Sequence, residues 1–287
     1  MKKTMGLIGT ACLLVSAIPR AAAEEPPPPP KILQIFREEV KPGKAAAHEK
    51  VEAGWPRAFA KANWPTRYLA LTSLTGPMEA WFAIGFDSFA AWEKDTKATE
   101  ANKALSAELE KLSVADAECI SGGRGLVAIH REDLGFGPNA DISKTRYFRI
   151  ITFKVRPGHD KDFTDAVKIV KDAYQKASVP ITWAVYQVSG GMSGPTYLVW
   201  VPMRSLAETD AVLGAMKAIQ EAEGDDGQKA LTKMAADGYL SVEQNFFAVS
   251  PKMSYPPKAW VDKDPGFWAP KSEAAPPKPV AKPAEKK

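Results

Sequence analysis

Lys41-Pro42-Gly43 is the stretch from which the fold can be worked out, because it returns as Arg156-Pro157-Gly158, 115 residues farther along the chain. A strand-like run precedes each copy, and a stretch with helical apolar spacing follows each. Other pairs recur in the same order: Trp64-Pro65 with Val179-Pro180, Gly76-Pro77 with Gly194-Pro195, Ser88-Phe89 with Ser205-Leu206, and residues 126–129 with 246–249. Matching features in a constant order indicate an internal duplication.

Each copy is predicted to run strand, helix, strand, strand, helix, strand, which is the order of a ferredoxin-like unit. The first unit covers residues 31–134 and the second covers residues 145–252. In the first unit the expected segments are a strand at 32–40, a helix at 44–63, a hairpin of 67–73 with 79–86, and a second helix capped by Ser88. Their counterparts are 147–155, 159–177, 182–188 with 196–201, and a helix capped by Ser205.

A four-stranded sheet with both helices on one face leaves its other face uncovered. Two tandem copies solve this by packing their uncovered faces together. We therefore predict an α+β fold in which two ferredoxin-like β-α-β-β-α-β units pair into one pseudo-dimeric, eight-stranded α/β barrel. Since both halves lie in one chain, the protein is expected to be a monomer or a homodimer of closed barrels.

The sequence resembles the dimeric α/β-barrel superfamily, most nearly its NIPSNAP-like and antibiotic-biosynthesis-monooxygenase-like branches. The resemblance covers residues 31–250 and rests on the Pro-Gly turn before the first helix of each unit. It rests also on the strand that runs into Phe86-Asp87-Ser88-Phe89-Ala90, matched by Met203-Arg204-Ser205-Leu206-Ala207. What it implies is the barrel fold; it also permits a cofactor-independent monooxygenase or isomerase-type enzyme.

The two ends of the chain differ from the middle in composition. Residues 1–23 are typical of a secretory signal peptide, so we expect a periplasmic or secreted bacterial protein. Residues 24–30 form a Pro-rich linker. Residues 253–287 form a C-terminal extension that is expected to be disordered from about residue 271. Within it, Trp260, Phe267 and Trp268 are expected to strap across the barrel or to cap one mouth.

Charge and cysteine content exclude several classes of protein. The formal net charge of +4 falls to +1 when Lys2, Lys3 and Arg20 leave with the signal peptide, so no nucleic-acid partner is expected. The apolar run of the signal peptide is too short to span a bilayer. Of the two cysteines only Cys119 lies outside the signal peptide, which excludes an internal disulfide and predicts a buried thiol.

Alternation along the strands predicts which side chains line the barrel lumen. Overlaying the two units places aromatic rings from the second and third strands on the inner face, with one carboxylate among them. The predicted ligand-binding residues are Tyr68, Glu79, Trp81, Trp183 and Trp200. Such a lumen suits a small, partly aromatic molecule. The alternative is that these rings fill the barrel, since eight-stranded barrels are narrow enough for side chains to do so.

Two residues are candidates for catalysis. Arg37 is expected in the lumen, where its guanidinium would stabilise an enolate or another anion, unless it lies at an exposed strand end. His130 ends the fourth strand on the face of Leu126 and Ala128, and it is the candidate general base. His48, which matches Phe163 of the second unit, is interpreted as a satisfied core histidine or a surface one, with a general base or ligand as the alternative.

Neither a metal nor a cofactor is predicted. No two histidines, and no Cys/His pair, have the spacing of metal ligands. Haem, which peroxidase-like members of the resembled superfamily bind through a helical histidine, is not expected because the second-unit helices have none in their interiors. Three functions stay open: an exported protein that binds a small, partly aromatic molecule in the barrel, a cofactor-independent monooxygenase or isomerase-type enzyme, and a structural or interaction module with a filled barrel.

Overall fold

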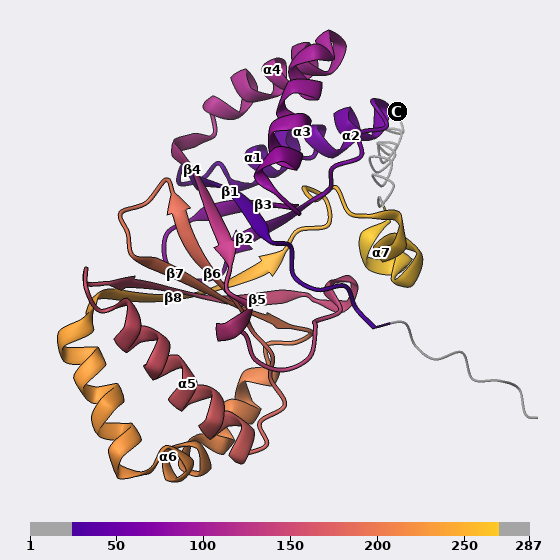
Figure 1. Ribbon diagram of the computed structural model, residues 1–287. Helices are drawn as coiled ribbons and strands as arrows, with labels where there is room; N and C mark the ends of the chain where they lie inside the picture. The colour runs from indigo at the N-terminus through magenta and orange to yellow at the C-terminus, as the bar shows by residue number, and fades with distance from the viewer. Residues whose placement is uncertain (1–24, 270–287) are drawn as a thin grey trace, which may run out of the picture.

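The protein is described by a computed structural model over residues 25–269. The predicted signal peptide and the tail from residue 271 lie outside the described residues. Eight antiparallel strands close into one barrel in the order β1-β3-β2-β8-β5-β7-β6-β4 (Figure 1). This confirms the predicted fold class.

Each half of the chain contributes four strands and the helices that cover their outer face (Figure 1). The first half contains β1 (Ile32–Val40), α1 (Ala45–Glu52), α2 (Gly54–Lys61), β2 (Tyr68–Ser73), β3 (Glu79–Phe86), α3 (Phe89–Ala101), α4 (Lys103–Ala117) and β4 (Ile120–His130). The second half contains β5 (Tyr147–Val155), α5 (Asp160–Lys176), β6 (Ala184–Gly190), β7 (Thr196–Met203), α6 (Glu208–Lys233) and β8 (Tyr239–Val249). Two short 3-10 turns, η1 (Glu132–Leu134) and η2 (Ile142–Lys144), connect the halves.

The two halves join at two seams related by the duplication. In one seam β2 pairs with β8, and in the other β4 pairs with β6. Within each half the central strands keep ferredoxin-like pairing, since β1 lies between β3 and β4, and β5 lies between β7 and β8. The barrel is therefore closed within one chain. Among residues 25–269, no helix is both long enough and apolar enough to cross a membrane.

The repeated Pro-Gly turn has a conformational reason. Gly43 has φ +79° and Gly158 has φ +91°, a left-handed backbone that glycine adopts without steric cost. Each turn redirects the chain from a strand into the first helix of its half. In the first half that helix is broken, contrary to the single helix expected over residues 44–63. Pro56 explains the break, because it has no N–H and its ring clashes with the carbonyl of Glu52, the last residue of α1.

The second helices begin differently in the two halves. Ser88 caps α3 as expected, its hydroxyl accepting a 3.1 Å hydrogen bond from the Ala91 N–H. The expectation that Ser205 caps α6 was wrong, because its hydroxyl accepts from Ala207 and the helix begins only at Glu208. At its other end α6 runs into a short π-helix, η3 (Met234–Gly238), before β8.

Residues after β8 close one end of the barrel. The short helices α7 (Lys258–Lys263) and α8 (Pro265–Trp268) pack against the side chains of the lumen. Trp268 is buried, and its indole N–H donates a 2.8 Å hydrogen bond to the Ser143 carbonyl. This segment therefore acts as the predicted cap. Cys119, which immediately precedes β4, is buried as expected.

Candidate functional site

Arg37, Glu79 and Trp81 hydrogen-bond to one another in the lumen, whereas Arg37 Nε and the Trp200 indole N–H are buried without a partner among the described residues. Arg37 is buried and donates hydrogen bonds of 2.8 and 2.9 Å to the two oxygens of Glu79. The indole N–H of Trp81 donates a third bond, of 2.7 Å, to the same carboxylate, and the Arg37 guanidinium lies 4.3 Å from the Trp81 ring centroid. Arg37 is thus in the lumen as expected, but its charge is already neutralised by Glu79.

Aromatic rings fill the rest of the lumen. The centroid of Trp81 lies 6.1 Å from that of Trp200 and 5.0 Å from that of Phe247, and Trp200 lies 5.5 Å from Phe148. These rings and the inward aliphatic residues of all eight strands form one buried core, which Trp268 completes. The inward orientation predicted for Trp81, Trp200 and Glu79 is therefore correct, but the lumen is a packed core in which these residues contact one another.

The prediction that Tyr68 and Trp183 face the lumen was wrong. Tyr68 packs beneath the helices, with ring centroids 5.9 Å from Phe59 and 6.4 Å from Tyr255. Trp183 precedes β6 and stacks on Phe136 at 4.6 Å. In both strands the neighbouring residues point inward instead: Leu69 and Leu71 in β2, and Ala184, Tyr186 and Val188 in β6.

The two predicted catalytic residues lie in different parts of the barrel. The backbone N–H of His130 donates to the Lys31 carbonyl at the beginning of β1, whereas Arg37 lies six residues farther along that strand. At the rise of a β-strand this separation is about 20 Å. His130 packs beside Tyr186, with ring centroids 5.2 Å apart, and burial lowers its pKa. The structure therefore does not bring Arg37 and His130 into one site.

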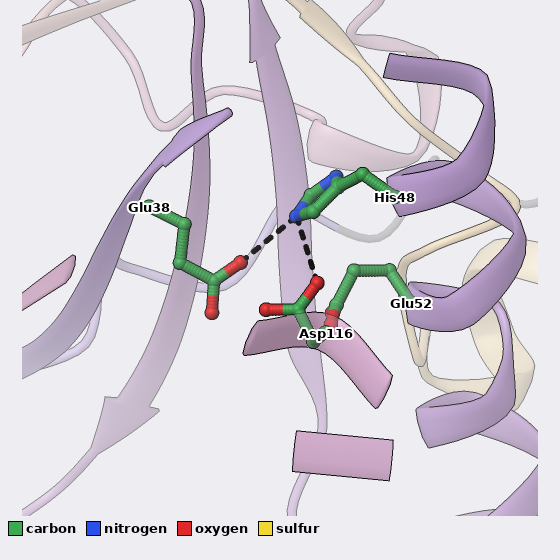
Figure 2. A group of neighbouring side chains, drawn as sticks. All are labelled: Glu38, His48, Glu52 and Asp116. Atoms are coloured by element: carbon green, nitrogen blue, oxygen red, sulfur yellow. Dashed lines mark hydrogen bonds and ion pairs between the residues drawn. The ribbon is translucent and has the colours of Figure 1, made fainter. Parts of the chain in front are cut away.

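A cluster of four ionisable side chains lies under the helices of the first half (Figure 2). We call Glu38, His48, Glu52 and Asp116 the carboxylate–histidine cluster. Glu38 comes from the outer face of β1, His48 and Glu52 from one face of α1, and Asp116 from the last turn of α4. His48 Nε2 lies 3.0 Å from Glu38 Oε2 and 3.5 Å from Asp116 Oδ1. One ligand-type atom from each residue lies within 4.8 Å of all the others.

Burial gives this cluster unusual electrostatics. The exposed fraction is 2% for His48 and 4% for both Glu52 and Asp116, whereas the Glu38 side chain is 21% exposed. Burial, with the charges of Glu38 and Asp116, raises the pKa of Glu52 from 4.5 to about 9. Burial and Glu38 also raise the pKa of Asp116, against the opposing effect of His48. At neutral pH the Glu52 carboxyl is therefore protonated unless another cation joins the group.

Part of this cluster could have been found in the sequence. His48 and Glu52 are spaced i, i+4, which places them on one face of a helix. Glu38 lies on the strand face opposite Arg37, which is the face that meets the helices. Asp116, by contrast, is 64 residues beyond Glu52, and no spacing rule relates the end of α4 to α1. The interpretation of His48 as a buried structural histidine identified its burial and missed its partners.

A groove of about 780 Å³ opens in the second half, between the sheet and the helices α5 and α6. One wall is aromatic: Phe136 stacks on Trp183, and Tyr174 lies edge-on to Trp183 at 5.4 Å. Arg149 enters the groove from the outer face of β5, and its Nε is buried without a hydrogen-bond partner among the described residues. Burial raises the pKa of Tyr174, and the nearby Arg149 guanidinium opposes that shift.

Known proteins resemble this chain in structure only. No protein-family model and no curated protein matches the sequence. A candidate monooxygenase from Fusobacterium nucleatum superposes with TM-score 0.50 at 13% identity, covering 77% of this chain and 93% of the other. At this identity the likeness is one of fold, the closed eight-stranded α+β barrel. An anthrone oxidase-like protein also has TM-score 0.50, at 16% identity, covering 77% and 92%. Chlorite dismutase from Candidatus Nitrospira defluvii has TM-score 0.46 at 9% identity, covering 78% and 92%.

Proposed function

We propose that this protein binds a small aromatic molecule carrying an acidic group, in the groove between the sheet and helices of its second half. The observation that carries the proposal is Arg149, a guanidinium placed beside an aromatic wall with its Nε buried and unpaired among the described residues. A carboxylate or phenolate in the groove would pair with the Arg149 guanidinium. The ring of the same ligand would pack on Phe136 and Tyr174.

The size of the groove supports a ligand of this kind. Its volume, about 780 Å³, falls within the range of sites that hold small molecules. Apolar side chains from β7 and α6, Val201, Met203 and Val212, offer contact area around the polar group. The sequence predicted a small, partly aromatic ligand, and the acidic group is added here because of Arg149. The proposed place differs because the lumen is filled by its own side chains.

An oxygenase or isomerase that uses Arg37 and His130 together is not supported by this geometry. Arg37 is paired with Glu79 inside the core, whereas His130, the last residue of β4, lies beside the beginning of β1. Neither residue lines the groove. If turnover occurs in the groove, Tyr174 is the hydroxyl beside Arg149 that is placed to move a proton.

The proposal is tested by titrating the full chain with benzoate, 2-naphthoate and anthrone, and by following heat or tryptophan fluorescence. We expect the carboxylates to bind with sub-millimolar Kd. Replacing Arg149→Met removes a charge-assisted hydrogen bond and is expected to weaken carboxylate binding roughly 10- to 100-fold. The matched control is Arg124→Met, because Arg124 pairs with Glu39 at an exposed position outside the groove. Equal affinity in the two variants, or no binding of any probe, would refute the proposal.

A further inference from the structure

The carboxylate–histidine cluster contains more acidic groups than basic ones. It holds three carboxyl groups and one imidazole, so even a protonated His48 neutralises only one of three possible negative charges. No arginine or lysine is among the residues that hydrogen-bond or ion-pair with these four side chains in the described part of the chain. Buried carboxylates are ordinarily paired with a cation or bound to a metal. We propose that Glu38, His48, Glu52 and Asp116 together bind one divalent transition-metal ion.

The spacing of the ligand atoms suits a single ion. Metal–nitrogen and metal–oxygen bonds of about 2.0–2.2 Å in a tetrahedral site separate neighbouring ligand atoms by about 3.4 Å. The two separations from His48 Nε2, 3.0 Å to Glu38 and 3.5 Å to Asp116, bracket that value. Figure 2 shows the Glu52 side chain extending from α1 toward Asp116. All four atoms can therefore reach one ion with small side-chain rotations.

The donor types select the class of metal. Three carboxylates alone would suit Mg²⁺ or Ca²⁺, which take oxygen ligands. The imidazole nitrogen of His48 shifts the preference toward Zn²⁺, Fe²⁺ or Mn²⁺, which accept mixed nitrogen and oxygen ligands. No thiolate is among the four ligands. A hard to intermediate divalent ion of the first transition row therefore fits best, and Zn²⁺ is the practical probe.

Besides the excess of acidic groups, two buried polar atoms in this region lack a hydrogen-bond partner among the described residues. Asp116 is only 4% exposed, and its Oδ1, directed at His48, accepts no hydrogen bond from any described residue. The hydroxyl of Tyr68 is also buried without a hydrogen-bond partner among these residues. A bound cation would satisfy Asp116 directly and would reduce the negative potential at Tyr68.

The second half of the same chain shows that the fold does not require these groups. The register of β1 and β5 places Phe153 where the first half has Glu38, and Phe163 and Val167 occupy the positions of His48 and Glu52. Met234 is the buried residue at the end of the helix that corresponds to α4. These apolar residues belong to one packed core. The first half thus replaces a hydrophobic cluster with four ligand-type groups.

Solvent access is consistent with reversible binding. Glu38 is the most exposed member of the cluster, with 21% of its side chain accessible, and it lies on the strand side of the other three. An ion would enter past Glu38 and then meet the buried His48, Glu52 and Asp116. Glu38 would be the ligand that exchanges with water.

The test uses the full chain, stripped with EDTA and then equilibrated with Zn²⁺ at pH 7.5. Metal content is measured by mass spectrometry after dialysis, and affinity by titration calorimetry. We expect one Zn²⁺ per chain. Glu52→Gln and Asp116→Asn keep the size of each side chain but remove a ligand charge, and we expect each to weaken Zn²⁺ binding by at least about 100-fold. Glu39→Gln is the control, since Glu39 neighbours Glu38 but pairs with Arg124 outside the cluster.

A second variant tests whether a loss of Zn²⁺ binding arises from removal of the ligands and not from unfolding. The triple substitution Glu38→Phe, His48→Phe and Glu52→Val copies the second half into the first, and circular dichroism in EDTA reports whether it folds. We expect a folded protein without Zn²⁺. Less than stoichiometric Zn²⁺ in the wild type would overturn the proposal, as would undiminished binding in Glu52→Gln or in the triple variant. Binding of Mg²⁺ or Ca²⁺ in preference to Zn²⁺ would overturn the assigned class of metal.

Discussion

Replacing Glu52→Gln is expected to stabilise the metal-free protein increasingly as the pH rises. The pKa of Glu52 is raised from 4.5 to about 9, so the folded state holds this proton more tightly than the unfolded state does. The stability associated with the protonated group is complete below about pH 4.5 and is lost progressively as the pH rises toward the folded-state pKa. At pH 7 the loss for this single group is about 3 kcal/mol. Glutamine does not titrate, so the variant does not lose this unfolding free energy.

The difference in unfolding free energy between Glu52→Gln and wild type should therefore grow by about 3 kcal/mol between pH 4.5 and pH 7. The groups that face Glu52 are Glu38 on β1, His48 on α1, Asp116 on α4 and Tyr68 on β2, and all four are present in both proteins. Their own titration therefore contributes similarly to the two pH profiles. Urea unfolding in EDTA, followed by circular dichroism at several pH values, measures the difference.

A constant difference across this pH range would refute the reasoning, because it would mean that Glu52 ionises in the folded protein as it does in water. Glu39→Gln supplies the baseline, since Glu39 is exposed and paired with Arg124. Adding Zn²⁺ in excess should remove most of this difference at pH 7, because an ion present at 100 times its Kd stabilises the wild type by about 2.7 kcal/mol. Zn²⁺ should leave the unfolding of Glu52→Gln almost unchanged.

Two further predictions concern the barrel itself. Arg37→Met leaves Glu79 buried without its cation and should lower the unfolding free energy by about 3–5 kcal/mol, whereas replacing Glu79→Met as well should recover most of that loss, as thermal unfolding of both variants would show. Equal stability of the single and double variants would contradict the ion-pair argument. Because β2–β8 and β4–β6 pair within one chain, sedimentation should detect a folded monomer on dilution. A dimer that dissociates only on unfolding would contradict closure within the chain.

The sequence predicted the fold where a local rule decided the structure. The Pro-Gly turns at Gly43 and Gly158 require a left-handed glycine and mark the same point in both halves. The alternation of side chains along β3 and β7 correctly predicted that Trp81 and Trp200 point into the lumen, because the two faces of these strands differ clearly in composition. It failed for Tyr68, since residues 68–71 are apolar on both faces of β2 and the pattern cannot choose between them. Trp183 was misplaced because it lies just before β6, where the strand register has not begun.

The candidate sites depended on contacts that no local rule describes. Asp116 reaches His48 only because α4 ends above α1, and this depends on how two helices pack on the sheet. The groove beside Arg149 depends on the distance between the sheet and the helices α5 and α6. The lumen was correctly predicted to be aromatic, yet whether it is hollow or filled depends on side-chain volumes from both halves and on the insertion of Trp268.

Two buried carboxylates of the first half show why the cluster calls for a cation from outside the chain. Glu79 and Glu52 are 5% and 4% exposed, so both would be costly to ionise without compensation. For Glu79 the chain supplies that compensation itself, with Arg37 and the indole N–H of Trp81. Around Glu52 the Trp55 side chain favours the ionised carboxylate, but burial and the like charges of Glu38 and Asp116 outweigh it and raise the pKa. The fold can therefore provide a fixed cation where one is needed for packing. Glu52, Asp116 and Glu38 instead converge on a point where the chain places only the single imidazole of His48, which is the arrangement expected of ligands for an exchangeable metal ion.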